Sequence, residues 1–484
     1  MTDPRPAAHC GTQADPASGV IRQTVDLVVV LCLGVLVFRT FSAEAYVVPT
    51  GSMAPTLLGN HRELTCPNCD YIFVIGLDEE GRPPHPVCPN CGKTELENVP
   101  AVECNGDRVL VQKFLYELRA PRRWEVAVFH FPGEPTQAYV KRVVGLPGES
   151  VQIAHGDIVI NGQIARKSLQ ELRGMQILVH DARYVPRDSD RFPRWYYLRG
   201  WLHHPLPSGW LQTEGGFKHQ YVSPAPGDPV DWLVYRHWDP IQGRYGPVRD
   251  HYAYNGSDLG SDNIVPDLAI EARLTLTKEV ETLAVRINSG SDRFVVHIPV
   301  GDRGTLEVVR NGRRSRVLPR YNPLGEHDRW PREVVLEASV VDQRLTVALG
   351  GQPLFEPLDY DDPSSGPPPD STPVALGVRG GSLSVSGLKL FRDVYYTPSL
   401  GNSLRRPHGV NEPYQLGADE FFVLGDNSPV SNDSRFWSGS PVVPRTMFLG
   451  KPFLVHLPGQ VVALELFGRS VYWVPDPRRI RYIH

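Results

Sequence analysis

The sequence lacks an excess of basic residues: it has 50 Lys and Arg against 54 Asp and Glu, a formal net charge of −4. This balance argues against a surface that binds nucleic acid. The composition is also not that of a disordered chain, because 41% hydrophobic and 21% charged residues are ordinary values for a globular protein. No internal repeat is evident. A chain of 484 residues is therefore long enough for two or three domains with cores of their own.

A long uncharged apolar run is missing too. The longest, "LVVVLCLGVLVF", has about 12 residues, whereas a helix needs about 20 to cross the hydrocarbon core of a bilayer. Extended to residues 21–41, the segment is long enough if its flanking charged side chains lie at the two interfaces. We therefore predict a cytoplasmic segment at 1–20 and a single transmembrane anchor at 21–41. The alternative is a cleaved secretory signal, since "AEA" at 43–45 resembles a cleavage site.

A GxSxG motif is absent, so nothing supports an α/β-hydrolase. What is present is Ser52, in "YVVPTGSMAPTLLGN". A serine hydroxyl is a poor nucleophile at neutral pH and needs a base within hydrogen-bond reach. Lys141 lies in "TQAYVKRVVGL", whose alternating pattern predicts a strand. Burial in such a strand would lower the pKa of the lysine amine and make it a competent base.

Taken alone, each of these features is weak, but four stretches of the sequence occur in an informative order. They read "VVPTGSMAPTL", "GDRVLVQKF", "YVKRVVGLPGE" and "LGDNSPVSNDSRFW". In this order the sequence strongly resembles type I signal peptidase, a membrane-bound Ser/Lys protease. The resemblance implies removal of signal peptides from exported preproteins through an acyl-enzyme. It also implies a bacterial cytoplasmic membrane location, with the catalytic domain extracytoplasmic and in contact with lipid.

The resemblance also implies roles for individual residues. Ser52 would be the nucleophile and Lys141 the general base, and the Ser52 backbone N–H and Thr50 would form the oxyanion hole. The stretch that begins at Gly425 would brace this pair of residues. Its expected members are Ser431, which would hydrogen-bond the lysine amine; Asp433 and Arg435, which would form an ion pair; and Asp426 and Asn427, which would shape the turn.

Four cysteines follow the nucleophile in two CxxC pairs, within "CPNCDYIFVIGLDEEGRPPHPVCPNC". This spacing matches a structural zinc ribbon, here predicted at 63–104, with the ligands Cys66, Cys69, Cys88 and Cys91. Four thiolates leave no open position for water, so catalysis itself needs no metal or other cofactor. Disulfides and redox chemistry are the alternatives, because an extracytoplasmic location favours oxidation.

We expect a mainly β architecture in which two insertions interrupt the catalytic fold. The catalytic pieces are predicted at 44–62, 105–167 and 396–456, with a tail at 457–484. The second insertion, 168–395, contains repeated alternating segments that predict a β-sandwich at about 267–395. That part also resembles, with low specificity, concanavalin-A-like or laminin-G-like modules. The resemblance implies a carbohydrate or protein ligand, with a purely structural insertion as the alternative.

Two other functions compete with the protease. One is a catalytically inactive, membrane-anchored binding or scaffold protein that uses the β-sandwich; intact Ser52, Lys141 and Asp433 argue against it. The other is a self-cleaving Ser/Lys repressor, which would lack an anchor and carry a DNA-binding domain. We expect the insertion at 168–395 to be dispensable for peptide-bond chemistry and to act in substrate selection or partner binding.

Overall fold

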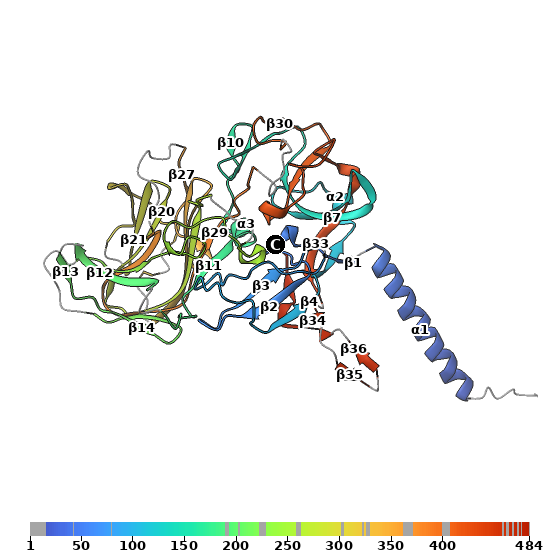
Figure 1. Ribbon diagram of the computed structural model, residues 1–484, viewed down its shortest axis with the longest axis horizontal. Coiled ribbons are helices and arrows are strands. Elements are labelled where there is room, and N and C mark those ends of the chain that lie inside the picture. The colour runs from blue at the N-terminus through green and yellow to red at the C-terminus, as the bar shows by residue number, and fades with distance from the viewer. Residues whose placement is uncertain are drawn as a thin grey trace, which may run out of the picture.

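The computed structural model is mainly β, as the sequence predicts, and has two lobes from which one long helix projects (Figure 1). One lobe carries Ser52 and Lys141, and the other is built from the chain between them and the C-terminal catalytic stretch. The structure describes residues 16–41, 43–78, 80–188, 193–201, 204–221, 229–257, 263–301, 304–321, 324–325, 330–361, 371–398, 407–456, 459–460, 464–466, 469–471, 474–475 and 477–483.

The main sheet of the catalytic lobe is antiparallel and joins strands from three distant parts of the chain. Its order is β1-β5-β33-β6-β7-β31-β32, with β38 paired to β33. The strands are β1 (Ala43–Val47), β5 (Arg108–Gln112), β6 (Val126–Phe131), β7 (Glu134–Gly145), β31 (Glu420–Leu424), β32 (Val443–Pro444), β33 (Phe448–Val455) and β38 (Arg481–Tyr482).

Alternation along β6 places apolar side chains on both faces of this sheet. Val126 and Val128 pack with Met53 beneath the nucleophile, whereas Ala127 and Phe129 pack in a second cluster with aromatic residues. Short helices cover the lobe: α2 (Leu115–Leu118), η1 (Gly51–Met53), η3 (Ser428–Val430), η4 (Arg445–Met447) and η5 (Pro477–Arg479).

Two smaller sheets complete this lobe. The first has the order β10-β9-β8-β30, with strands β8 (Ser150–Ala154), β9 (Asp157–Ile160), β10 (Gln163–Ile164) and β30 (Tyr414–Gln415). The second carries the cysteine loops and has the order β3-β2-β4-β34-β37. Its strands are β2 (His61–Thr65), β3 (Ile72–Gly76), β4 (Ala101–Cys104), β34 (Gly459–Gln460) and β37 (Val474–Pro475), and β35 (Leu464–Leu466) pairs with β36 (Arg469–Val471) nearby in sequence.

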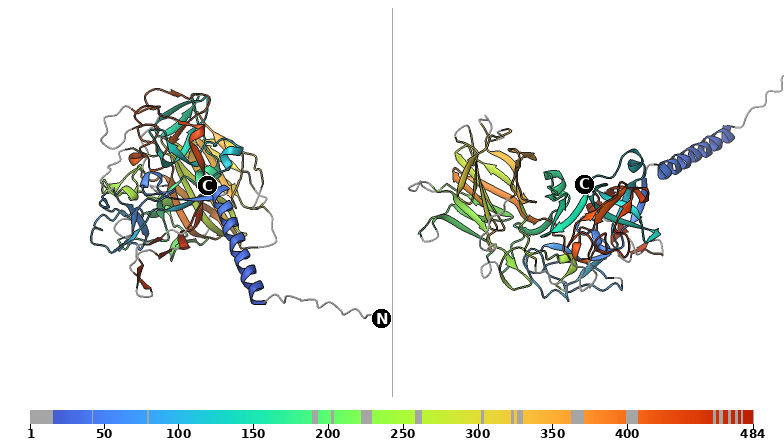
Figure 2. Two further views of the ribbon diagram at one scale, coloured as in Figure 1. Left: turned by 90° about the vertical axis from the view of Figure 1, so that its right-hand side faces the viewer. Right: turned by 90° about the horizontal axis from the view of Figure 1, so that it is seen from above.

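The other lobe consists of two antiparallel sheets that share one core (Figures 1 and 2). The first sheet contains β11 (Ile177–Asp181), β14 (Trp210–Thr213), β15 (Gly216–His219), β19 (Leu268–Leu276), β24 (Arg332–Val341), β25 (Arg344–Leu349), β26 (Gln352–Pro353), β27 (Leu358–Asp359) and β29 (Leu383–Arg392). The second contains β12 (Trp195–Trp201), β13 (His204–Leu206), β16 (Asp231–Tyr235), β20 (Val280–Ser289), β21 (Asp292–Pro299), β22 (Glu307–Arg310), β23 (Arg313–Arg316) and β28 (Val374–Gly380).

Alternate residues of these strands point into the shared core, which makes this lobe a β-sandwich. Ile270 and Leu274 from β19 meet Leu283 and Val285 from β20 there. The sheets include strands from Ile177 onward, ahead of residue 267, where we predict the sandwich to begin. The chain before residue 267 therefore supplies the strands at one end of each sheet: β14 and β15 in the first, and β13, β12 and β16 in the second.

The two ends of the sandwich segment lie together at the junction with the catalytic lobe. Lys167 Nζ lies 2.8 Å from Asp393 Oδ2, and the Tyr396 N–H donates to the Gly156 carbonyl at 3.0 Å. The helix α3 (Leu169–Arg173) opens the segment with a capping box formed by Ser168 and Glu171. Between β16 and β19 the chain forms a hairpin of β17 (Trp238–Asp239) and β18 (Arg244–Tyr245), followed by the short helix η2 (Ala253–Asn255).

The N-terminal helix α1 (Pro16–Phe41) projects from the catalytic lobe, away from the sandwich (Figure 2). Among the described residues, no helix is both long and apolar enough to cross a membrane. The anchor at 21–41 therefore stays a prediction. Most of the predicted 1–20 segment and much of the 457–484 tail lie outside the described residues.

Candidate active site

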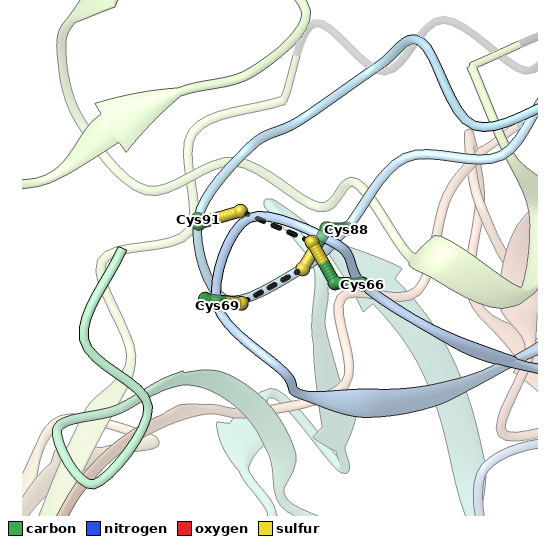
Figure 3. Close-up of side chains that lie close together, drawn as sticks. All are labelled: Cys66, Cys69, Cys88 and Cys91. Atoms are coloured by element: carbon green, nitrogen blue, oxygen red, sulfur yellow. Dashed lines mark hydrogen bonds between the residues drawn. The ribbon is translucent and has the colours of Figure 1, made fainter. Parts of the chain in front are cut away.

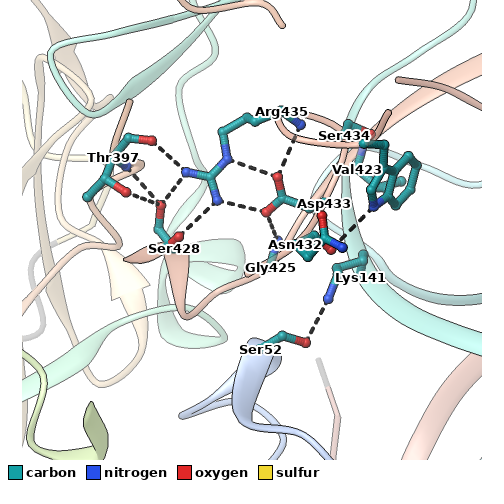
Figure 4. Close-up of polar contacts among 11 residues, drawn as sticks. Ser52, Lys141, Thr397, Val423, Gly425, Ser428, Asn432, Asp433, Ser434 and Arg435 are labelled. Atoms are coloured by element: carbon teal, nitrogen blue, oxygen red, sulfur yellow. Dashed lines mark hydrogen bonds and ion pairs between the residues drawn. The ribbon is translucent and has the colours of Figure 1, made fainter. Parts of the chain in front are cut away.

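Ser52 and Lys141 meet although 89 positions separate them in the sequence. Ser52 lies in η1, a single turn between β1 and β2, and Lys141 lies in the centre of β7, opposite Ala127 of β6. The Lys141 amine is 2.6 Å from Ser52 Oγ (Figure 4). This distance suits proton transfer between a nucleophile and its base.

Burial sets the protonation of Lys141. The residue is 4% exposed, and burial lowers the pKa of its amine from 10.5 to about 8. The negative charge of Asp433 acts in the opposite direction, because it stabilises the ammonium form. A substantial fraction of the amine is therefore neutral at mildly alkaline pH.

Strand pairing brings the C-terminal stretch beside Lys141. β31 pairs with β7, placing Leu424 opposite Arg142. The loop after β31 then passes Ser52 and Lys141, which we call the dyad. In that loop, Asp433 and Arg435 form a fully buried ion pair, with Nη2 2.7 Å from Oδ2. The Gly425 N–H also donates to Asp433 at 3.0 Å, and Arg435 donates to the Thr397 carbonyl at 2.6 Å (Figure 4). A charged pair with this many hydrogen bonds forms a fixed support.

Ser431 does not make its predicted hydrogen bond to Lys141. Its hydroxyl is buried and has no hydrogen-bond partner among the described residues. The space beside it is tight, because a Cβ added to Gly425 would collide with Ser431 Oγ and the Ser52 carbonyl oxygen. Gly425 thus allows the loop after β31 to approach Ser52 closely.

Asp426 does more than shape a turn: it forms a buried ion pair with Arg142, the residue after Lys141. Its carboxylate accepts Arg142 Nη2 at 2.6 Å and Nε at 2.7 Å. The Thr56 hydroxyl donates to the same carboxylate at 2.5 Å. Asp426 therefore joins the lysine strand to the segment that follows the nucleophile.

Asn427 contacts the nucleophile loop directly. Its side-chain amide donates to the Gly51 carbonyl at 3.0 Å, and its backbone N–H donates to the Ser52 carbonyl at 3.1 Å. Thr50, by contrast, is exposed at the N-terminus of η1 and makes no capping hydrogen bond. Its hydroxyl is available to solvent or substrate beside Ser52.

The four cysteines come together in the second small sheet. Cys66 and Cys69 lie in the turn between β2 and β3, and Cys88 and Cys91 lie in the loop that leads to β4 (Figure 3). All four are buried, and their sulfur atoms lie within 4.8 Å of one another. Two sulfur–sulfur distances are 3.5 and 3.7 Å. Sulfurs 2.3 Å from one tetrahedral zinc ion would be about 3.8 Å apart, so this cluster fits the metal.

The two loops have the same turn geometry. In each, the fourth residue after the first cysteine, Asp70 or Gly92, adopts a positive φ and donates its N–H to that cysteine's carbonyl. None of the described cysteines forms a disulfide, since an S–S bond requires about 2.05 Å. Repeated turns that aim four sulfurs at one point are typical of metal knuckles.

The comparisons with known proteins find signal peptidases similar to parts of this chain. The family described as "Signal peptidase, peptidase S26" matches residues 94–193 and 375–457, the segments that contain Lys141 and Asp433. Signal peptidase I of Leptolyngbya laminosa is 32% identical over 171 residues. Over the matched segments this chain is similar to signal peptidases of the S26 family.

These similarities cover only part of the proteins compared. The Leptolyngbya match covers 34% of this chain and 60% of that signal peptidase. Signal peptidase I of Pseudomonas aeruginosa is 29% identical over 148 residues, which is 28% of this chain and 36% of that protein. A carbohydrate binding module, CBM66 from Bacillus subtilis, matches 41% of this chain and 94% of its own at 11% identity, with a TM-score of 0.24. That similarity is too low to support any argument about a ligand.

Several residues at this candidate site were not predicted. Arg142 and Thr56 flank predicted residues in sequence, so their proximity to the site was a usable signal. Tyr254 and Asn255 of η2 also lie against the nucleophile loop. They are far from every motif in the sequence, so nothing in the sequence marks them as part of the site. Their position depends on how the long insertion returns to the catalytic lobe.

Proposed function

We propose that this chain is a serine endopeptidase that removes N-terminal signal peptides from exported preproteins. The observation that carries the proposal is the 2.6 Å contact between Ser52 Oγ and a lysine amine whose pKa burial lowers to about 8. An inactive scaffold protein would have no need to retain such an expensive buried amine, so we do not favour that alternative.

The reaction we infer uses the lysine twice. The neutral Lys141 amine accepts the Ser52 proton as Oγ attacks the scissile carbonyl, and the resulting ammonium protonates the leaving amine. Lys141 then accepts a proton from a water molecule that attacks the acyl-enzyme and returns it to Ser52 Oγ. The oxyanion would be held by the Ser52 backbone N–H and Thr50, while Asp433 and Arg435 support the strand of the base.

We also propose a structural zinc ion at Cys66, Cys69, Cys88 and Cys91. Bound zinc would stabilise the loops by tying four thiolates together, and it would leave catalysis to the dyad. The loops surround a small core of their own that includes Leu64 of β2, twelve residues after Ser52. We infer that the folded cysteine loops hold β2 in place and, through β2, the loop that carries Ser52.

The cytoplasmic membrane is the location we propose, because signal peptides emerge there. The predicted anchor at 21–41, contact with lipid, and an extracytoplasmic catalytic lobe belong to this proposal. A carbohydrate or protein ligand of the sandwich stays a prediction. Fractionation of cells expressing the full chain, with alkaline extraction, tests the location: recovery in the soluble fraction would contradict it.

The decisive test of function is cleavage of a preprotein by wild type and by Lys141→Ala. Wild type should release a fragment of the length of the signal peptide, and the variant should release none above background. Sequencing the new N-terminus locates the cleaved bond, which should follow small residues at the −1 and −3 positions of the preprotein. Cleavage by both proteins, or by neither, would refute the proposed function.

A further inference from the structure

The short helix η2 (Ala253–Asn255) belongs to the sandwich segment in sequence, yet it lies against the nucleophile loop. Tyr254 is 4% exposed and packs in a cluster with Ala54 and Leu58, which both follow Ser52 closely. Its hydroxyl donates to the Asn60 carbonyl at 3.3 Å. The insertion thus covers the nucleophile loop with a buried aromatic side chain.

The Tyr254 ring occupies the space that side chains at two glycines would need. A Cβ added to Gly51, the residue before the nucleophile, would collide with Tyr254 Cε1, and so would one added to Gly76 at the end of β3. The ring is therefore enclosed between the backbone of η1 and that of the cysteine-bearing sheet. Close packing of this kind restricts the movement of η1, because interiors are about as dense as organic crystals.

Asn255 extends the contact by hydrogen bonds. Its side-chain amide and that of Asn427 donate to each other, at 2.7 and 2.8 Å. The same Asn427 amide donates to the Gly51 carbonyl at 3.0 Å. A continuous hydrogen-bonded path therefore runs from the insertion through Asn427 to the residue that precedes Ser52.

The segment around η2 is itself held firmly. Arg392, at the end of β29, donates to the carbonyls of Asp250 and His251 at 2.9 and 3.0 Å. On the other side, the Ser257 N–H donates to the His85 carbonyl at 3.0 Å, in the loop before Cys88. Because η2 is anchored both to the sandwich and to the cysteine loop, it can hold the position of the nucleophile loop.

We propose that Tyr254 and Asn255 are positioning residues for Ser52, so that the inserted segment completes the catalytic site. The inference rests on the proposed Ser52/Lys141 chemistry and adds to it a part of the chain outside the matched catalytic segments. It replaces our expectation that the whole of 168–395 is dispensable for peptide-bond chemistry. Displacement of a reacting group by about 1 Å can cost 10²-fold in rate, so modest contacts at this position matter.

The experiment compares full-length wild type with Asn255→Ala, Tyr254→Ala and the conservative Tyr254→Phe. The matched control is Asn288→Ala, which removes an asparagine amide bonded to the Thr372 carbonyl inside the sandwich. Three quantities are measured for each protein: kcat and KM on a signal-peptide substrate, the rate of Ser52 modification by a fluorophosphonate between pH 7 and 10, and the thermal midpoint. Modification rates are normalised to the stoichiometry reached at completion.

We expect Asn255→Ala to lower kcat and the modification rate about tenfold, and Tyr254→Ala about 100-fold, with KM changed less than twofold. The pH midpoint of modification should stay unchanged, because neither residue touches Lys141. Tyr254→Phe should recover most of the rate, since it keeps the ring, and Asn288→Ala should match wild type. A purely structural role would instead lower the thermal midpoint and the modified fraction while leaving the normalised rate unchanged.

The readouts separate this inference from the proposed function. If wild type is modified at Ser52 but cleaves no signal peptide, the substrate assignment fails, and the modification rates of the variants still decide the positioning role. Modification of Asn255→Ala and Tyr254→Ala at the wild-type rate would overturn the positioning role. If wild type cleaves the signal peptide but resists the fluorophosphonate, kcat decides instead, and a wild-type kcat in Asn255→Ala and Tyr254→Ala would overturn the positioning role.

Discussion

At the scale of single residues, the proposed chemistry depends on one buried amine. Lys141 is almost inaccessible, and burial is the largest cause of its lowered pKa. The nearby Asp433 limits that decrease, but its charge is shared with Arg435 at 2.7 Å. The Asp433–Arg435 ion pair thus stabilises the site without restoring the pKa of Lys141 to its ordinary value.

The dyad should behave as a unit. Ser52→Ala and Lys141→Ala should each lower kcat/KM by about 10³-fold or more, and the double variant should lose little beyond either one. Wild-type activity should rise with pH through about 8, because the base must be neutral. Initial rates from pH 6 to 10 measure both effects. Additive losses, or a rate that is flat across this range, would contradict a Ser/Lys mechanism.

The same amine should cost stability. Its folded-state pKa is about 8 against 10.5 unfolded, so below pH 8 the folded state must keep a charge buried that the unfolded state exposes to water. Each pKa unit corresponds to about 1.4 kcal/mol. Lys141→Met should therefore raise the free energy of unfolding by about 3 kcal/mol at pH 7, while abolishing activity.

This gain should shrink as the pH rises from about 8 to 10.5, because the unfolded lysine then also loses its proton. Urea denaturation at pH 7 and at pH 10 measures it, with the exposed Lys278→Met as the control. A variant that is less stable than wild type at pH 7 would show that folding does not lower the pKa of the Lys141 amine.

At the scale of elements, the cysteine loops and the nucleophile loop are successive parts of one structure. β2 leaves the nucleophile loop and ends at Thr65, immediately before Cys66. Apolar residues of β2 and β3 pack with all four cysteines. Loss of the metal should therefore reach η1 through a few residues of strand.

Purified protein should contain one zinc ion per chain, measured by elemental analysis. Cys66→Ser and Cys88→Ser should lose the metal, protect fewer amides of β2 and β3 from hydrogen exchange, and lower activity about tenfold or more. Cys104→Ser is the matched control, because Cys104 is buried in β4 outside the cluster. Full activity in a folded, zinc-free variant would show that the loops and the nucleophile are uncoupled.

At the scale of the whole molecule, the two lobes meet at a cluster of buried charges. Lys167 pairs with Asp342 at 2.7 Å and Asp393 at 2.8 Å, while carboxylate oxygens of Asp157, Asp267 and Asp342 lie within 4.8 Å of one another. Burial and then the charge of Asp342 raise the pKa of Asp157 to about 7. One lysine cannot neutralise all of these acids, so the junction favours a protonated carboxyl.

Asp157→Asn should therefore stabilise the protein, by about 4 kcal/mol, above pH 7. The sign follows from the raised pKa: between about pH 4 and 7 the folded state binds a proton that the unfolded state has lost, so wild-type stability falls as the pH rises. Denaturation of both proteins at pH 5 and pH 8, in buffers without added divalent cations, measures the difference, with the exposed Asp419→Asn as the control. An equal difference between wild type and Asp157→Asn at both pH values would argue against a buried ionised Asp157.

Much of the site was predictable because its chemistry is concentrated in short motifs. Ser52, Lys141, Asp433 and Arg435 lie in stretches whose order along the chain is informative, and the two CxxC pairs specify a four-thiolate cluster by spacing alone. Alternation of apolar residues likewise predicted the mainly β fold, because a strand buries every second side chain. These are local properties, and local sequence records them.

Tertiary structure alone decided what crosses between distant segments. The orphaned Ser431 hydroxyl, the pairing of Asp426 with Arg142, and the early start of the sandwich at Ile177 all depend on register and on which strands become neighbours. Asn255 reaches Asn427 across 172 positions, and no periodicity in the sequence encodes that contact. Such contacts are set by how complete sheets pack, whereas the residues that we propose as nucleophile, base and metal ligands could be named from short motifs and from the spacing of the cysteines.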